Sequence, residues 1–255
     1  MALQIVTIPC LADNYAYLAH DPATGATAVV DVPDAAPVLA ALRARGWTLS
    51  DVLLTHHHAD HVQGLEGLLA QAPARVIGAA ADAHRLPPLD LAVADGDTLR
   101  IGHEIGHVLA VPGHTLGHVA YHFPDSGAVF TADSLMALGC GRVFEGTMEQ
   151  MHASLARLAA LPPDTLVFSG HEYTAANARF AATIDPDNPR LAARIREVEQ
   201  TRAENRPTVP TTLGEELATN PFLRAHDGAI RARLGMADAP EAEVFAEIRR
   251  RKDRF

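Results

Sequence analysis

A dense group of potential metal ligands lies early in the chain, at Thr55-His56-His57-His58-Ala59-Asp60-His61. Five of these seven residues carry an imidazole or a carboxylate, and both groups bind transition metals. The group directly follows the apolar run 51–54, which has the length and composition of a short buried strand. This arrangement predicts that the strand delivers one part of a metal site.

Three further apolar segments also end at a potential ligand. They are 108–111 before His114, 128–130 before Asp133 and 166–168 before His171. Loops that follow the strands of an α/β sheet converge at one edge, so separate segments of this kind can build a single site. The candidate ligands are His56, His58, Asp60, His61, His114, Asp133 and His171.

These seven ligands are more than one metal ion needs. A catalytic zinc ion usually has about three protein ligands and a water. We therefore expect two divalent ions per chain, most simply Zn²⁺ although Fe and Mn accept the same ligands, with Asp133 as the shared carboxylate. Ions roughly 3.5–4 Å apart would hold a water between them and make it a hydroxide nucleophile at neutral pH. Asp60 is a candidate for orienting that hydroxide.

Composition excludes several classes of protein. The chain has 255 residues, 48% of them apolar, and a formal net charge of −10, which disfavours nucleic-acid and anionic-membrane binding. Its two cysteines provide neither a disulfide framework nor a thiolate cage for zinc. No apolar run is long enough to span a membrane, and no signal peptide is evident at the start. We expect a cytoplasmic, monomeric enzyme with a small-molecule substrate.

The secondary-structure pattern changes near residue 173. Before it, short strands alternate with helices, the first helix being expected at 35–45 and ending at Gly46. Beyond it the strand signal stops, and helical periodicity continues to the end of the chain. We therefore predict an α+β fold in two domains, a metal-binding catalytic domain at 1–173 and a helical substrate-binding domain at 174–255.

The metal motif resembles that of the metallo-β-lactamase superfamily, whose later motifs have counterparts in the same order at 113–115, Asp133 and 170–172. The resemblance implies a four-layer αβ/βα sandwich with a dinuclear metal site at one edge, here followed by an all-helical domain. It also implies the ligand sets: His56, His58 and His114 for the first ion, Asp60, His61 and His171 for the second, and Asp133 as the bridge.

More specific stretches resemble the glyoxalase II family, the hydroxyacylglutathione hydrolases. They are 11–15, 139–147, 171–174, 220–222 and 249–255, so the resemblance extends over nearly the whole chain. It implies hydrolysis of S-(2-hydroxyacyl)glutathione, chiefly S-D-lactoylglutathione, to glutathione and D-lactate, the second step of methylglyoxal detoxification. The substrate contacts that it implies are Arg142, Phe144, His171, Tyr173, Arg249 and Lys252.

The chain departs from the family pattern at three positions. The family commonly has lysine and tyrosine where Arg142 and Phe144 stand, and glycine where Ala132 precedes Asp133. Arginine keeps the positive charge, phenylalanine lacks a hydroxyl for the peptide, and alanine is a small steric change. Lys252, the only lysine, lies among arginines at the end of the chain, and such a group also suits a solvated helix terminus.

Other interpretations make different predictions. A persulfide dioxygenase of the same superfamily would use one iron with two histidines and a carboxylate, but the long helical tail argues against it. A lactonase or β-lactamase would share the metal motif without Arg249 and Lys252. A non-catalytic scaffold would have lost ligands, and all seven are present. His57 and His118 flank the ligands, and Cys140, between two glycines, is expected to be a turn residue rather than a nucleophile.

Overall fold

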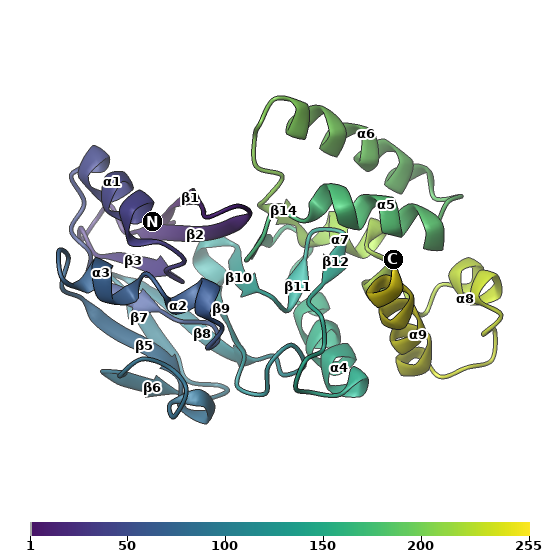
Figure 1. Ribbon diagram of the computed structural model, residues 1–255, viewed down its shortest axis with the longest axis horizontal. Coiled ribbons are helices and arrows are strands. Elements are labelled where there is room, and N and C mark those ends of the chain that lie inside the picture. The colour runs from purple at the N-terminus through teal and green to yellow at the C-terminus, as the bar shows by residue number, and fades with distance from the viewer. Residues whose placement is uncertain (1) are drawn as a thin grey trace. The chain divides into compact units, whose positions relative to one another are not determined.

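A computed structural model describes residues 2–255 and divides the chain into two compact units (Figure 1). Unit 1 comprises the residues up to Ala110 together with Leu116–Thr131, and unit 2 comprises Val111–Thr115 with Ala132–Phe255. Within residues 2–255, no helix combines the length and the apolar character needed to cross a bilayer.

Unit 1 contains a six-stranded sheet in the order β1-β2-β3-β4-β5-β6. The strands are β1 (Gln4–Cys10), β2 (Asn14–His20), β3 (Thr27–Val30), β4 (Asp51–Leu53), β5 (Arg75–Ala79) and β6 (Leu91–Val93). The pairs β1–β2 and β2–β3 are antiparallel, whereas β3 to β6 are parallel. Strands β3 and β4 are buried throughout, and apart from Thr27 and Asp51 at their first positions they are apolar, as expected for strands covered on both faces.

Helices α1 (Ala35–Arg45) and α3 (Leu65–Leu69) lie beside this sheet (Figure 1). Their apolar side chains form one core with those of the sheet. The core joins Val29 and Val52 of the sheet to Leu39 and Leu68 of the helices. Helix α1 ends at Gly46, whose φ of 64° lies in the left-handed region that favours glycine, and this confirms the predicted stop.

Unit 1 also contains the antiparallel strands β7 (Thr98–Ile101), β8 (Glu104–Ala110), β9 (Val119–Phe123) and most of β10 (Ala128–Ala132). They pack on the first sheet through Tyr17 and Phe130, whose ring centroids are 5.6 Å apart. The Tyr121 hydroxyl donates to the Leu54 carbonyl at 2.8 Å, directly before the ligand cluster. The first sheet is therefore covered by helices and by a second layer of strands.

Unit 2 is mostly helical. Its helices are α4 (Met148–Ala159), α5 (Thr174–Ile184), α6 (Pro189–Ala203), α7 (Leu213–Thr219), α8 (Gly228–Leu234) and α9 (Glu241–Arg254). Its strands are β11 (Leu135–Met136), β12 (Gly139–Cys140), β13 (Leu166–Ser169) and β14 (Thr211–Thr212). Strand β14 pairs with β13, so the expectation of no strand beyond residue 173 is wrong. Strand β14 has only two residues, which is too short to give a periodic signal in the sequence. The division at 173 stays a prediction.

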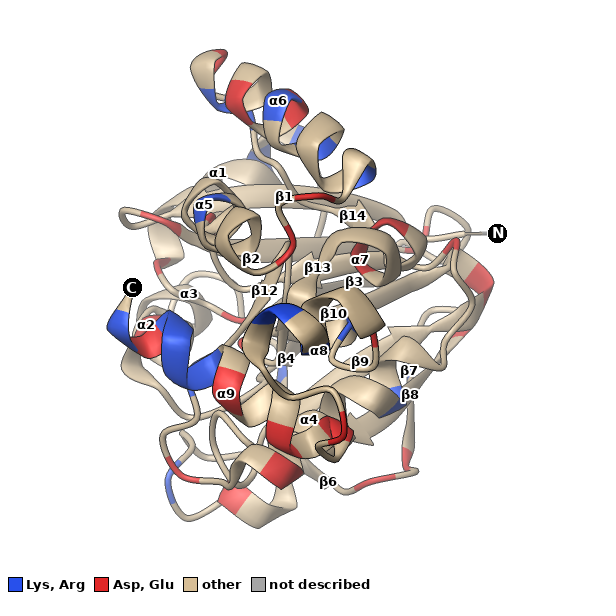
Figure 2. Cartoon of the chain, turned by 90° about the vertical axis from the view of Figure 1, so that its right-hand side faces the viewer, with Lys and Arg blue, Asp and Glu red and all other residues tan. Residues whose placement is uncertain are grey.

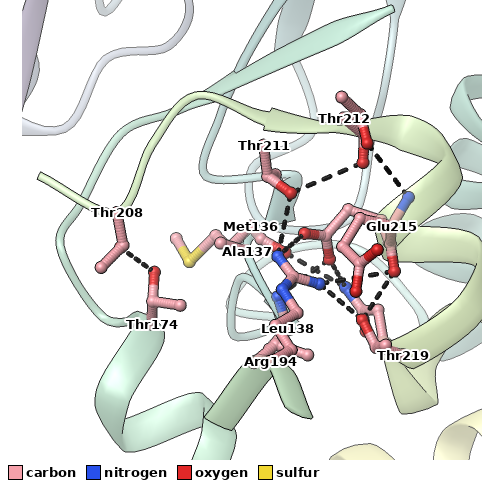
Figure 3. A network of polar contacts seen from close by, with 12 residues as sticks. Met136, Ala137, Leu138, Thr174, Arg194, Thr208, Thr211, Thr212, Glu215 and Thr219 are labelled. Atoms are coloured by element: carbon pink, nitrogen blue, oxygen red, sulfur yellow. Dashed lines mark hydrogen bonds and ion pairs between the residues drawn. The ribbon is translucent and has the colours of Figure 1, made fainter. Parts of the chain in front are cut away.

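A buried polar network joins α6, α7 and the β11–β12 hairpin of unit 2 (Figure 3). The Arg194 guanidinium pairs with the Glu216 carboxylate and also donates to Thr219 and Thr211. Glu216 accepts in turn from the Leu138 backbone N–H at 2.9 Å. Because Leu138 lies in the turn of the hairpin, the network fixes where the following loop begins.

Candidate metal centre and substrate-contact residues

The ligands of unit 1 lie at the edge where β4 ends. His56 and His61 are completely buried, whereas Asp60, in the first turn of α2 (Ala59–Val62), keeps 44% of its side chain exposed. His56 Nε2 lies 3.2 Å from His58 Nδ1, and His61 Nε2 lies 3.7 Å from Asp60 Oδ2. The structure therefore brings together the four ligands that the sequence predicts for this unit.

Asp31 orients this cluster, and the sequence analysis missed it. Its Oδ2 accepts from His61 Nδ1 at 2.8 Å and from the Thr55 hydroxyl at 2.8 Å, and its Oδ1 accepts from the Thr55 N–H at 2.9 Å. Because the proton of His61 lies on Nδ1, its Nε2 is the atom available to a metal. Asp31 follows β3 at the same sheet edge, so the strand-end pattern could have found it.

His57, between two ligands, makes a different contact. Its Nδ1 lies 3.1 Å from Asp82 Oδ2, and Asp82 also pairs with Arg85 at 2.6 Å. His118 is buried and stacks on His56 with a centroid distance of 4.7 Å and an interplanar angle of 12°. His57 therefore contacts the Asp82 carboxylate, and His118 contacts the His56 ring. Both histidines lie beside the candidate ligands, as the sequence indicates.

In unit 2, one carboxylate oxygen of Asp133 faces both candidate histidine ligands. Asp133 Oδ2 lies 3.4 Å from His114 Nε2 and 3.3 Å from His171 Nε2, and all three side chains are buried. His114 Nδ1 donates to the Arg142 carbonyl at 2.8 Å, so its Nε2 faces the carboxylate. An imidazole lone pair and a carboxylate oxygen repel each other unless a proton or a cation lies between them. This donor set therefore fits a divalent ion.

The aromatic rings of two predicted substrate residues contact the imidazole rings of these candidate ligands. The Phe144 ring meets the His114 ring edge-on at 5.3 Å, and the Tyr173 ring stacks on His171 at 4.6 Å. Arg142 is exposed, and its guanidinium lies 5.8 Å from the Phe144 ring centroid. Phe144 itself is 60% exposed, so both rings extend from buried ligands toward solvent.

Arg249 is buried and holds the backbone of the loop before Arg142. Its Nη1 donates to the Cys140 carbonyl at 2.9 Å, and its Nη2 pairs with Asp253 at 2.9 Å. Asp253 also lies 3.4 Å from Arg142 Nε and therefore connects the two arginines. Burial raises the pKa of the Cys140 thiol to about 11 although Arg249 lowers it, so the thiol stays protonated and is a poor nucleophile.

Lys252 lies half-buried near the end of α9, where basic side chains gather (Figure 2). Its Nζ lies 5.2 Å from the Phe180 ring and 5.3 Å from the Phe255 ring, and donates to the Ala176 carbonyl. Burial, and then the charge of Arg249, lower the pKa of Lys252 to about 8. No carboxylate in residues 2–255 forms an ion pair with it.

Ala132 is more constrained than its small size suggests. Its φ is 40°, in the left-handed region, and its side chain is buried. Its carbonyl accepts from the Gly170 N–H at 3.0 Å, and this bond joins the segments that carry Asp133 and His171. The departure from glycine here therefore strains the backbone, in addition to the small steric change that the sequence suggests.

Comparisons with known proteins identify the family of this chain. The profile of the metallo-beta-lactamase superfamily matches residues 20–171, more than half of the chain, and the fold is that of this superfamily. The profile described as the hydroxyacylglutathione hydrolase C-terminus matches residues 172–255. The chain belongs to the hydroxyacylglutathione hydrolase family.

Relatives named hydroxyacylglutathione hydrolase match along the full length. One from Jannaschia sp. (strain CCS1) is 65% identical over 252 residues, which cover 99% of this chain and 98% of the relative. One from Cereibacter sphaeroides (strain ATCC 17029 / ATH 2.4.9) is 63% identical over 255 residues and 100% of both chains. At this identity the family assignment, including enzyme activity, covers both units.

Two solved structures are more distant. ETHE1 from Myxococcus xanthus is 30% identical with a TM-score of 0.58, and the match covers 92% of this chain and 100% of that one. TTHA1623 in a di-iron-bound form is 28% identical with a TM-score of 0.61, and the match covers 86% of this chain and 100% of that one. The second therefore shows that a related fold holds two metal ions.

Proposed function

We propose that this protein hydrolyses S-(2-hydroxyacyl)glutathione thioesters, chiefly S-D-lactoylglutathione, to glutathione and a 2-hydroxy acid. The main support for the proposal is that the Lys252 ammonium group has no carboxylate partner among the described residues, although the chain carries a net charge of −10. A half-buried ammonium of this kind suits an anionic ligand, and glutathione has two carboxylates.

Two divalent ions fit the donor sets. We assign His56, His58 and His114 to one ion and Asp60, His61 and His171 to the other, with Asp133 shared. The shared role is supported by the two imidazoles that face Asp133 Oδ2 at 3.3 and 3.4 Å. When bound, such ions would activate a water and polarise the thioester carbonyl. Zinc is our choice, and iron or manganese would accept the same ligands.

The chain itself supplies orientation and binding. Asp31 fixes the tautomer of His61, and the Arg142 carbonyl fixes that of His114. We propose that Arg142, Phe144, Tyr173 and Lys252 contact the glutathione peptide. Arg249 holds the loop before Arg142 through its hydrogen bond to the Cys140 carbonyl. A thiol has a pKa of about 8.5, so it leaves as thiolate and needs no general acid. This explains why the site can work without one.

One assay tests the proposal. Purified, metal-replete protein is given S-D-lactoylglutathione, and loss of the thioester is followed with and without a chelator. We expect hydrolysis that the chelator abolishes and that returns when Zn²⁺ is added back. Absence of chelator-sensitive hydrolysis would refute the function. Elemental analysis that finds one metal per chain would refute the dinuclear site separately.

The rival activity in the same superfamily can be measured on the same sample. A persulfide dioxygenase would consume oxygen when given glutathione persulfide, and we expect no consumption here because relatives at 63–65% identity carry the hydrolase name. The monomeric state and the cytoplasmic location stay predictions. Gel filtration tests the first and cell fractionation the second.

A further inference from the structure

We propose that Asn14 is a positioning residue that fixes the carboxylate of Asp60 and thereby sets the affinity of the second metal ion. The proposal rests on the metal assignment given above, but its tests do not depend on which substrate the enzyme cleaves. Asn14 and Asp60 both belong to unit 1 and are 46 residues apart in the sequence.

The amide of Asn14 makes two bonds to the same residue. Its Nδ2 donates to Asp60 Oδ2 at 3.0 Å and to the Asp60 backbone carbonyl at 3.1 Å. Both partners are acceptors, so the chemistry requires the NH₂ group at this place rather than the amide oxygen. The two bonds hold the side chain of Asp60 at a fixed angle to its own backbone.

Asp60 needs such support because of where it lies. It is in the first turn of a four-residue helix, and 44% of its side chain is exposed. An exposed carboxylate on a short helix can adopt several rotamers in water. Asn14 is only 4% exposed, and a buried partner of this kind can hold an exposed ligand in one orientation.

The sheet places Asn14 at this edge. Strand β2 begins at Asn14 and runs antiparallel to β3, with Tyr17 paired to Val30. The first residue of β2 therefore lies beyond the end of β3, on the side where β3 and the parallel β4 deliver their polar residues. The hairpin before β2, in which Leu11 has a φ of 50°, keeps this position fixed in register with β1.

A neutral donor is suited to this task. The amide occupies one lone pair of Asp60 Oδ2 and leaves the remaining lone pairs of the carboxylate for a cation. It also leaves the negative charge intact, whereas lysine or arginine at position 14 would neutralise it. Loss of an outer hydrogen-bond partner of a metal ligand typically lowers metal affinity about 10- to 100-fold.

The test is a metal-affinity measurement on Asn14→Leu, which removes the donor and nearly keeps the side-chain shape. Metal-free protein is titrated with Zn²⁺ against a chromophoric chelator, and the two binding steps are resolved. We expect affinity for one ion to fall about 10-fold or more and affinity for the other to stay unchanged. Unchanged affinity at both steps would overturn the proposal.

Two comparisons separate positioning from general destabilisation. Asn188 is a matched control because its Nδ2 also bonds one carboxylate, Asp185 at 2.8 Å, and one carbonyl, Ala218 at 2.9 Å, without a metal ligand. Asn188→Leu should lower the unfolding temperature and leave both zinc affinities unchanged. In an Asp60→Ala background, Asn14→Leu should have no further effect on zinc binding. Equal loss in Asn188→Leu, or an additive loss with Asp60→Ala, would contradict a specific role.

The wild-type protein gives a test that needs no variant to fold. The side-chain amide of Asn14 should give ¹⁵N–¹H resonances that shift as the ion bound by Asp60 is added and stay in place as the other ion is added. If neither addition moves these resonances, Asn14 does not contact the ligand as we propose.

Discussion

His114 donates from Nδ1 to the backbone carbonyl of Arg142 at 2.8 Å, so a predicted metal ligand and a predicted substrate contact are joined by one hydrogen bond. Phe144 continues the connection, because its ring lies against the same imidazole at 5.3 Å. The loop that we propose to contact the substrate is therefore attached to a proposed metal ligand. Movement of one changes the position of the other.

The charge of Lys252 predicts a pH dependence of substrate binding. Its pKa is lowered to about 8, so the ammonium is present below that pH and is lost as the pH rises through it. KM for the anionic substrate should therefore rise several-fold above pH 8, whereas kcat should change less. Steady-state kinetics as a function of pH measure this.

Lys252→Arg is the control, because arginine stays charged throughout this range. Its KM should lack the rise near pH 8. The same rise in Lys252→Arg would assign the titration to another group.

Phe144→Tyr should improve substrate binding. The phenyl ring is 60% exposed beside His114, so a hydroxyl added at its tip can reach the peptide without a packing clash. A hydrogen bond contributes about 0.5–1.5 kcal/mol, which corresponds to a KM lower by roughly 2- to 10-fold. Phe144→Leu, which cannot form the bond, should not lower KM. An unchanged KM in Phe144→Tyr would show that the tip of the ring does not face the peptide.

Ala132→Gly should stabilise the protein. At a φ of 40° alanine carries roughly 1–2 kcal/mol of strain, and glycine removes this at an entropic cost of about 0.5–1 kcal/mol. The net gain corresponds to a Tm higher by about 1–3 °C for a chain of this size. Thermal unfolding measures it. Ala120→Gly is the matched control in an ordinary buried strand and should lower Tm, whereas a fall in Tm for Ala132→Gly would contradict the strain.

Asp31→Ala should weaken binding of the ion held by His61, because the imidazole loses the acceptor that fixes its tautomer. We expect an affinity loss of about 10- to 100-fold in zinc competition titrations. Asp82→Ala removes the equivalent partner of His57 and should leave zinc affinity unchanged. A similar loss in both variants would show that His57 binds metal.

Glu216→Gln should destabilise unit 2 strongly, because it leaves the buried guanidinium of Arg194 without its counter-charge. We expect a loss of about 3–5 kcal/mol in urea unfolding. The exposed pair of Arg190 and Glu215 is the control, and Glu215→Gln should cost less than about 1 kcal/mol.

The double variant Arg194→Met/Glu216→Leu should recover much of the stability lost in Glu216→Gln, because both buried charges are then absent. A Glu216→Gln variant as stable as the wild type would show that the pair contributes little. Glu216→Gln should also raise KM. Glu216 accepts a hydrogen bond from the Leu138 N–H, and this turn precedes the loop that we propose to contact the substrate.

The sequence by itself indicated most of the strands and helices and the candidate ligands. Apolar runs that end at His56, Asp133 and His171 specify both the strands and the polar residues that follow them, because strand and ligand are adjacent in the chain. Gly46 ended the first helix as predicted, since a left-handed residue at a helix terminus favours glycine. The family motifs supplied the substrate class.

Only the tertiary structure revealed the residues that orient the ligands. Asp31 reaches His61, and Asn14 reaches Asp60, across 30 and 46 residues of sequence. The strand-end pattern could mark Asp31 as a candidate, but which ligand Asp31 and Asn14 contact depends on the pairing order of β2, β3 and β4, which no local pattern encodes. The strain at Ala132 was hidden for the same reason. The left-handed φ of Ala132 accompanies a hydrogen bond from the distant Gly170 N–H to its carbonyl, and the local sequence does not reveal that bond.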